Sequence, residues 1–206
     1  MIWLIATVAA LACGMATAQP LIDGNAKAGE KKAAVCAACH GPAGNSTNPI
    51  WPKLAGQHAA YLYKQLKLFK AGKRKNPIMQ AQAAGLSGQD MRDLAVYFSL
   101  QTMSPGVANE KLVDRGFTLY RVGDAEAGIP ACAGCHGPAG RGNAAAAYPE
   151  ISGQHAKYLA AQLTAFREGK RGDYPSAQIM HGVAKNLTDE DIRALASYIQ
   201  GLSLAP

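Results

Sequence analysis

An internal duplication is the feature that most constrains how this chain can fold. The segment "VCAACHGPAG" at 35–44 returns as "ACAGCHGPAG" at 131–140, and the residues that follow, 51–101, match 148–202. The offset between the copies grows from 96 at the cysteines to 101 near the end, so the second copy carries insertions. Self-similarity at this period indicates one structural unit built twice. The join is predicted in "TMSPGVANE", 102–110, which is rich in turn-forming residues.

Each copy has the apolar periodicity of helices, and no alternation typical of strands competes with it. In 58–70, Leu62, Leu66 and Phe69 recur at helical spacing, as Leu159, Leu163 and Phe166 do in the second copy. The last helix of each copy is predicted to begin at a capping box opened by Ser87 or Thr188. Its core face is then Met91, Leu94, Ala95 and Phe98, or Ile192, Leu195, Ala196 and Ile199. A shorter helix is expected to lead into each cysteine pair. The fold class is therefore all-α.

The first eighteen residues are interpreted as a secretory signal peptide. They contain no charged side chain and end in Ala16-Thr17-Ala18, a small-x-small pattern that signal peptidases accept. We expect cleavage after Ala18, with residues 19–104 and 105–206 forming the two domains of an exported, periplasmic protein. An uncleaved membrane anchor is the alternative interpretation.

The cysteines predict covalent haem. Of five, Cys13 lies in the signal peptide, and the other four form two pairs, each followed directly by a histidine. Cys-x-x-Cys-His is the attachment signature of c-type haem, and in a helical turn positions i, i+3 and i+4 share one face. A zinc ribbon would need cysteine pairs much closer than 96 residues, and a thiol redox site would need a βαβ context. We therefore expect two haem c groups, attached at Cys36, Cys39, Cys132 and Cys135, with iron bound by His40 and His136.

The second axial ligand follows from the methionines. Met180 is the only methionine of the second half, and the repeat aligns it with Met79. Met91 aligns with Ile192 and is interpreted as core. Met79 and Met180 are therefore the expected sixth ligands of the two irons. Three other histidines, His58, His155 and His181, are less favoured as ligands.

At this point both halves resemble class I cytochrome c domains, and the pair resembles the two-haem cytochrome c4 family over nearly all of residues 19–206. The resemblance implies that Pro52 and Pro149 accept hydrogen bonds from the haem histidines and that Leu54 and Ile151 press on the haems. It also makes a set of polar residues plausible propionate contacts: Gln57, Gln154, Tyr61, Tyr158, Arg74 and Arg171. The family's glycine-to-aromatic helix contact corresponds to Gly116 and Tyr120. The first half has Gly29 and Ala33 there, so a looser contact is expected.

The function expected from these features is electron transport rather than catalysis. His/Met ligation fills both axial positions of each iron, which leaves no site for peroxide or oxygen. The resemblance implies respiratory partners, namely a quinol-oxidising complex and a terminal oxidase or reductase, with peripheral membrane association as a further expectation. The alternatives are a diheme electron-accepting subunit of a dehydrogenase, such as a flavin-dependent sulfide dehydrogenase, a diheme peroxidase, or a haem-based gas sensor.

Charge is divided unequally between the halves. Residues 19–104 hold eleven Lys/Arg and four Asp/Glu, a balance of +7, whereas residues 105–206 hold ten of each. No basic-aromatic motif indicates nucleic-acid binding. The asymmetry predicts that the first domain docks with an acidic partner, through a basic cluster made of Lys64, Lys67, Lys70, Lys73, Arg74 and Lys75.

Overall fold

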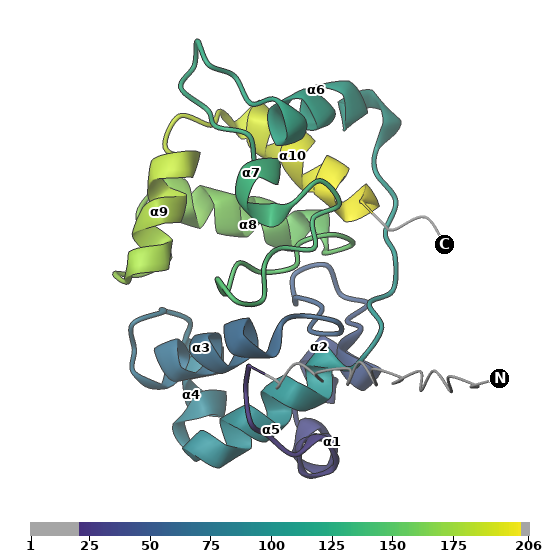
Figure 1. Ribbon diagram of the computed structural model, residues 1–206, viewed down its shortest axis with the longest axis vertical. Coiled ribbons are helices and arrows are strands. Elements are labelled where there is room, and N and C mark those ends of the chain that lie inside the picture. The colour runs from purple at the N-terminus through teal and green to yellow at the C-terminus, as the bar shows by residue number, and fades with distance from the viewer. Residues whose placement is uncertain (1–20, 203–206) are drawn as a thin grey trace, which may run out of the picture.

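In the computed structural model, which describes residues 21–202, each copy of the repeat folds into its own group of helices (Figure 1). The first group comprises α1 (Ala26–Ala33), α2 (Ala37–His40), the 3-10 turn η1 (Pro42–Gly44), α3 (Ala59–Lys70), α4 (Pro77–Ala84) and α5 (Gly88–Ser99). The second comprises α6 (Glu110–Arg121), α7 (Ala133–His136), α8 (Ala156–Arg167), α9 (Pro175–Ala184) and α10 (Asp189–Gly201). Two isolated bridges are the only β pairing in the described part of the chain. The all-α prediction is confirmed, while the signal peptide lies outside the described residues.

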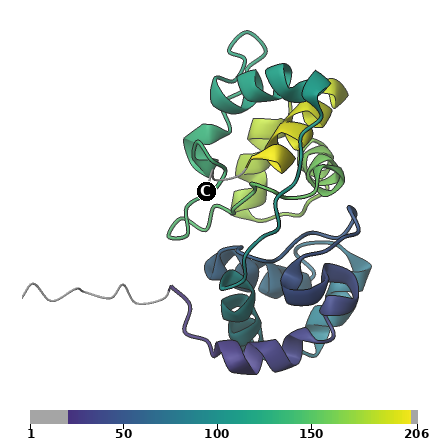
Figure 2. The same cartoon turned by 90° about the vertical axis from the view of Figure 1, so that its right-hand side faces the viewer.

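The segment that joins the two groups has no regular secondary structure. It covers residues 102–109, within the predicted join, and runs from the end of α5 to the start of α6 (Figure 2). Within residues 21–202, none of the helices combines the length and apolar character that crossing a bilayer requires.

The last helix of each domain begins as the sequence predicts. The Ser87 Oγ accepts a hydrogen bond from the backbone N–H of Asp90 at 3.1 Å, and the Asp90 carboxylate accepts one from the Ser87 N–H at 2.8 Å. Thr188 and Asp191 form the same reciprocal pair. A capping side chain of this kind stabilises a helix by about 1 kcal/mol. The two capping boxes therefore fix where α5 and α10 start.

Each domain has a hydrophobic core of its own, centred on its last helix. Met91, Leu94 and Phe98 of α5 are buried, as are Ile192 and Leu195 of α10. Against these faces pack the apolar residues of α3 and α8, which were predicted from their spacing. The predicted core faces of both final helices are confirmed.

The first and last helices of each domain cross at a glycine. A Cβ atom added to Gly29 would lie 2.1 Å from the Asp93 carbonyl oxygen, and one added to Gly116 would lie 2.5 Å from that of Ala194. The expected looser contact in the first half is therefore wrong at this crossing, because the backbones approach as closely there. The two halves differ in the aromatic residue that accompanies this glycine, since the first half has Ala33 where the second half has Tyr120. Tyr120 is fully buried, and its hydroxyl donates a hydrogen bond to the Gly137 carbonyl at 2.7 Å.

Replacing Gly29 with valine is expected to lower the free energy of unfolding by about 1–3 kcal/mol or more, because the new side chain overlaps the α5 backbone. Thermal unfolding of the haem-loaded protein would measure the loss. Gly85→Ala is the matched control, since Gly85 has φ −81° and no atom within 4 Å of an added Cβ. Equal melting temperatures for the two variants would contradict the close crossing.

The approach to the second cysteine pair differs from expectation. α1 has eight residues and is short, as predicted, but α6 has twelve and is as long as α8. The inserted residues after Arg121 form a loop closed by two backbone hydrogen bonds between Asp124 and Ile129, at 2.7 and 2.8 Å. Because this loop lies between α6 and Cys132 in the chain, α6 does not lead directly into the cysteine pair.

The two domains meet through the repeated Gly-Gln-His segments. The side-chain amide of Gln57 donates to the Glu150 carbonyl at 2.7 Å and accepts from the Glu150 N–H at 3.0 Å. Gln154 does the same to the backbone of Lys53, at 2.8 and 2.9 Å. These exchanged contacts relate the domains by an approximate two-fold axis, so each domain binds the other with the same residue type.

Candidate haem centres

Each cysteine pair lies on a single turn of helix that ends at the histidine. Cys36 is the N-cap of α2 and His40 is its last residue; Cys132 and His136 stand in the same way on α7. Within residues 21–202, none of the four cysteines forms a disulfide. Burial raises the pKa of the Cys132 thiol to about 11, and burial likewise raises that of Cys36. A thiol–disulfide redox site requires a lowered pKa, so these environments do not suit one.

Both haem histidines are held by a proline carbonyl. The Nδ1–H of His40 donates to the Pro52 oxygen at 2.8 Å, and that of His136 donates to the Pro149 oxygen at 3.0 Å. Burial lowers the pKa of each imidazole, and the bond to the proline carbonyl opposes that shift. Burial favours the neutral ring, and because Nδ1 carries the donated proton, Nε2 is the nitrogen available to bind iron. The hydrogen bonds implied by the resemblance are present in both domains.

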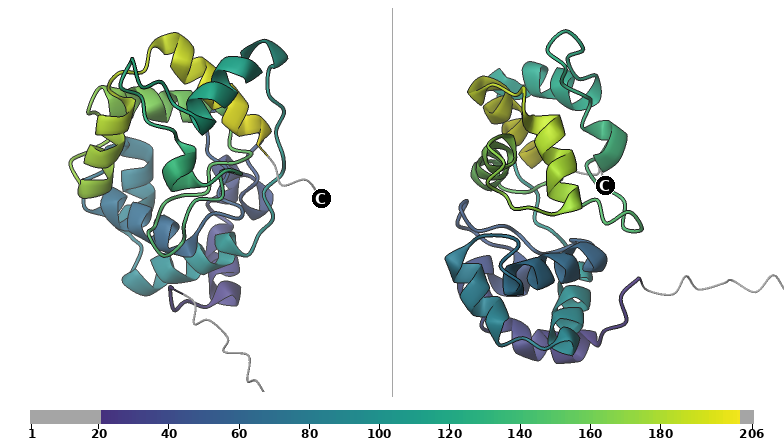
Figure 3. Two further views of the ribbon diagram at one scale, coloured as in Figure 1. Left: turned by 45° about the horizontal axis from the view of Figure 1, so that its top comes forward. Right: turned by 90° about the vertical axis from the view of Figure 1, so that its left-hand side faces the viewer.

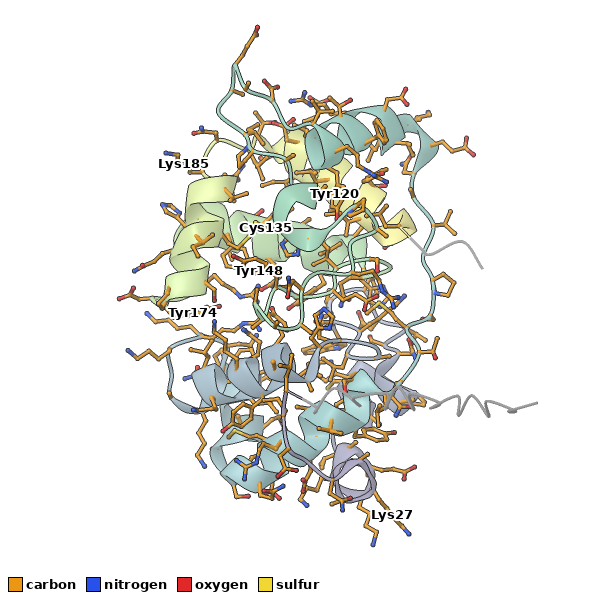
Figure 4. The ribbon with its side chains drawn as sticks, viewed as in Figure 1. Lys27, Tyr120, Cys135, Tyr148, Tyr174 and Lys185 are labelled. Atoms are coloured by element: carbon orange, nitrogen blue, oxygen red, sulfur yellow. The ribbon has the colours of Figure 1, made fainter. Side chains whose placement is uncertain are left out.

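The apolar residue two positions after each proline packs against the same core as the first cysteine of that domain. Leu54 packs with Cys36 against the first core, and Ile151 packs with Cys132 against the second. Both side chains are half-buried. Figure 4 shows Cys135 on α7, with Tyr148 in the loop beneath it. The ring of Tyr148 lies 6.5 Å from that of His136, between centroids.

The two methionines lie on corresponding helices, Met79 as the third residue of α4 and Met180 as the sixth residue of α9. Met79 and Met180 are half-buried, and each helix opens with a proline. The Asn76 side chain caps α4 by accepting from the Met79 N–H at 2.9 Å. α4 packs on α3, and α9 packs on α8, as Figure 3 shows from the side. The role of these methionines as iron ligands stays a prediction.

An apolar groove is lined in part by Ile179, the residue before Met180. It has a volume of about 600 Å³ and separates the loop after α6 from α9. Its lining includes the apolar side chains of Val122, Ile129, Ile179 and Val183.

The two glutamines expected at the propionates have another role. Gln57 and Gln154 use both ends of their amides on the backbone of the opposite domain, as described above. The neighbouring histidines join them: His58 Nε2 donates to the Arg141 carbonyl at 2.7 Å, and His155 Nε2 donates to that of Ser46 at 2.8 Å. Sequence reasoning missed this role, although "GQH" in both copies was the available signal.

The tyrosines and arginines of the same set form a buried cationic cluster between the domains. Arg74 donates to the Tyr158 hydroxyl at 3.0 Å, and Arg171 donates to that of Tyr61 at 3.1 Å. Both guanidinium groups are buried, and among the ion pairs of residues 21–202 neither has a carboxylate partner. The Arg171 Nε is buried without any hydrogen-bond acceptor.

A buried positive charge with an unused donor is costly unless an anion completes it. Carboxylates are the anions that bind a guanidinium group best, and each haem carries two of them as propionates. Arg74 and Arg171 are therefore suited to bind haem propionates, and would hold them at the domain interface.

Comparison with known proteins gives the same assignment. The family model for cytochrome c matches residues 26–101 and again 113–203. Cytochrome c4 of Azotobacter vinelandii is 51% identical over 188 residues, covering 87% of this chain and 90% of that one. A thiosulfate dehydrogenase electron acceptor of Stutzerimonas stutzeri is 40% identical, covering 95% of this chain and 93% of that one.

A solved structure shares the arrangement of both domains. The crystal structure of reduced recombinant cytochrome c4 from Pseudomonas stutzeri superposes with a TM-score of 0.84 at 50% identity. The superposition covers 88% of this chain and 100% of the solved cytochrome c4 chain. The family match in both halves, the identity over most of each chain and the shared fold lead to one conclusion. The chain belongs to the cytochrome c family, as a two-domain electron carrier of the cytochrome c4 type with two covalent haem c groups.

Proposed function

We propose that this protein carries electrons between respiratory complexes in the periplasm through two haems ligated by histidine and methionine. The observation that carries the proposal is the duplicated cysteine turn whose histidine is held, in both domains, by a proline carbonyl. When bound, each haem supplies one iron that cycles between the ferrous and ferric states. A quinol-oxidising complex is the proposed donor, and a terminal oxidase or reductase is the proposed acceptor.

The protein's own residues attach, orient and shield these haems. Pro52 and Pro149 fix the tautomer and direction of the histidine rings, which raises their basicity as ligands. Leu54 and Ile151 exclude water beside them. The proposed ligand sets are Cys36, Cys39, His40 and Met79 for the first haem, and Cys132, Cys135, His136 and Met180 for the second. With both axial positions filled, the irons transfer electrons without binding substrate, and we propose no enzymatic activity.

A relative named as the electron acceptor of a thiosulfate dehydrogenase favours a second candidate function. That protein is 40% identical to this one over nearly its full length. Under this alternative, the chain accepts electrons from a sulfur-compound dehydrogenase rather than from a quinol-oxidising complex. Stopped-flow reduction of the purified protein by each donor would distinguish the two candidates.

The mature protein is expected to carry the mass of two haems after denaturation, because thioether bonds survive unfolding. Mass spectrometry of the denatured chain measures this directly. A double Cys132→Ser, Cys135→Ser variant is expected to retain one haem and lose the other. A mass equal to that of the bare polypeptide, or a second haem retained in the variant, would contradict the attachment sites.

A further inference from the structure

Lys53 and Glu150 occupy equivalent positions in the two copies but carry opposite charges. Each directly follows the proline whose carbonyl holds a haem histidine. The backbone N–H and C=O of each residue both form hydrogen bonds with the side-chain amide of the glutamine in the opposite domain. We call this pair of hydrogen bonds the backbone clamp. The two side chains are buried, with residue exposures of 5% and 7%. The repeat therefore places a buried cation at one position and a buried anion at the matching one.

Glu150 lies in the chain between two residues that the family resemblance assigns to the second haem site, Pro149 and Ile151. The Pro149 carbonyl accepts the hydrogen bond from His136, and Ile151, like Cys132, packs against the core of the second domain. The carboxylate accepts from the Ser152 hydroxyl at 3.0 Å. Its cationic partner, Arg141, stands 3.5 Å away with a side chain that is 57% exposed. Because solvent screens an exposed partner, Arg141 offsets only part of the buried negative charge.

The Lys53 ammonium is shared between the domains. It donates to the Ser104 carbonyl at 2.7 Å and, across the interface, to the Gly153 carbonyl at 2.9 Å. Burial lowers the pKa of Lys53. No ion pair of the described residues joins it to a carboxylate. The ammonium therefore lies between the two domains, whereas the Glu150 carboxylate contacts only residues of the second domain.

Adding an electron to a haem makes its surroundings one charge more negative. A nearby buried carboxylate disfavours that step, and a buried ammonium favours it, since neither is screened as a surface charge is. We propose that Glu150 is a tuning residue that lowers the reduction potential of the second haem and biases electrons toward the first. Lys53 raises both potentials. The inference rests on the proposed haem ligands.

The test is a spectroscopic redox titration of the haem-loaded protein that follows each haem separately. Glu150→Gln keeps the backbone clamp and the side-chain volume while removing the charge. It is expected to raise the second potential and shift electron exchange between the haems about tenfold toward the second domain, equivalent to about 59 mV for a one-electron couple. Lys53→Gln is expected to lower both potentials, whereas Lys53→Arg, which keeps the charge, is expected to leave them close to wild type.

Matched controls remove the same charges from exposed sites. Glu126→Gln and Lys27→Gln alter exposed residues, and Lys27 lies at the far end of the first domain from the interface (Figure 4). Both are expected to shift the potentials much less, because water screens these charges. Thermal unfolding of each variant verifies that it folds. The inference is overturned if Glu150→Gln shifts the second potential no more than Glu126→Gln does, lowers it, or moves both potentials equally.

Failure of the ligand proposal would be recognised separately. Met79→Ala and Met180→Ala assign the two haems, because each is expected to alter one of them. If neither variant alters a single haem, the ligand proposal is wrong. The tuning inference would still be tested by the mean of the two haem potentials. Relative to wild type, this mean must rise in Glu150→Gln and fall in Lys53→Gln.

Discussion

Replacing Met180 with alanine is expected to abolish the sulfur–iron charge-transfer band of one haem and to lower its reduction potential. A thioether ligand favours ferrous iron, so its loss should lower the potential by on the order of 0.1 V, a fraction of the ~0.8 V range that axial ligands span. The vacated position should bind carbon monoxide when the haem is reduced. Optical spectra, a redox titration and carbon monoxide difference spectra measure the three effects.

Two further variants complete this experiment. Met79→Ala is expected to produce the same changes at the other haem only. Met91→Ala is the control, because Met91 is 2% exposed and belongs to the face of α5 that packs into the first domain. It should destabilise the fold by about 2–5 kcal/mol and leave both charge-transfer bands intact. A Met180→Ala spectrum identical to wild type would refute the assignment, since the second half has no other methionine to take its place.

Reversing the charge of Lys70, Lys73 and Lys75 to glutamate is expected to slow association with an acidic redox partner by about 10–10³-fold at low salt. All three lysines are exposed, and none takes part in an ion pair of the described chain. They extend from the end of α3 into the following turn on the domain whose charge balance is +7. Stopped-flow electron transfer to the acidic domain of a terminal oxidase measures the rate. The effect should fade as salt rises, because the screening length is ~10 Å at 0.1 M.

Two arginines are left out of the charge-reversal experiment because the structure buries them. Arg74 was expected in the basic cluster, and Arg171 would be its counterpart in the second domain, but both are buried between the domains. The comparison set is therefore Lys157, Lys170 and Lys185, three exposed lysines of the second domain. Reversal of these should slow association less. Equal slowing by both sets, or a rate that does not depend on salt, would show that the first domain has no special part in docking.

Features that depend on local spacing were predictable from the sequence. Helix starts at Ser87 and Thr188 follow from side chains three residues apart, and the buried faces of α5 and α10 follow from the helical period. The proline carbonyls at both histidines followed from the family resemblance. The long α6 was not predicted, because helix length depends on where the inserted loop turns back, and no periodicity encodes that.

The domain interface was the main omission. A repeat shows that Gln57 and Gln154 are equivalent, but it does not show that each faces the other domain. The sequence predicts Arg74 and Arg171 as propionate contacts, but it does not show that each donates to a tyrosine of the opposite copy. Contacts between separate copies join residues about ninety positions apart, which no pattern within one copy can reveal.

The exchanged glutamine contacts also bear on how the two halves could diverge after duplication. Gln57 and Gln154 bind backbone N–H and C=O groups, which every residue except proline provides in full. Recognition of this kind is indifferent to the side chain at the clamped position. Mutation could therefore place lysine in one half and glutamate in the other without loosening the association, so that a symmetric scaffold came to hold two unequal halves.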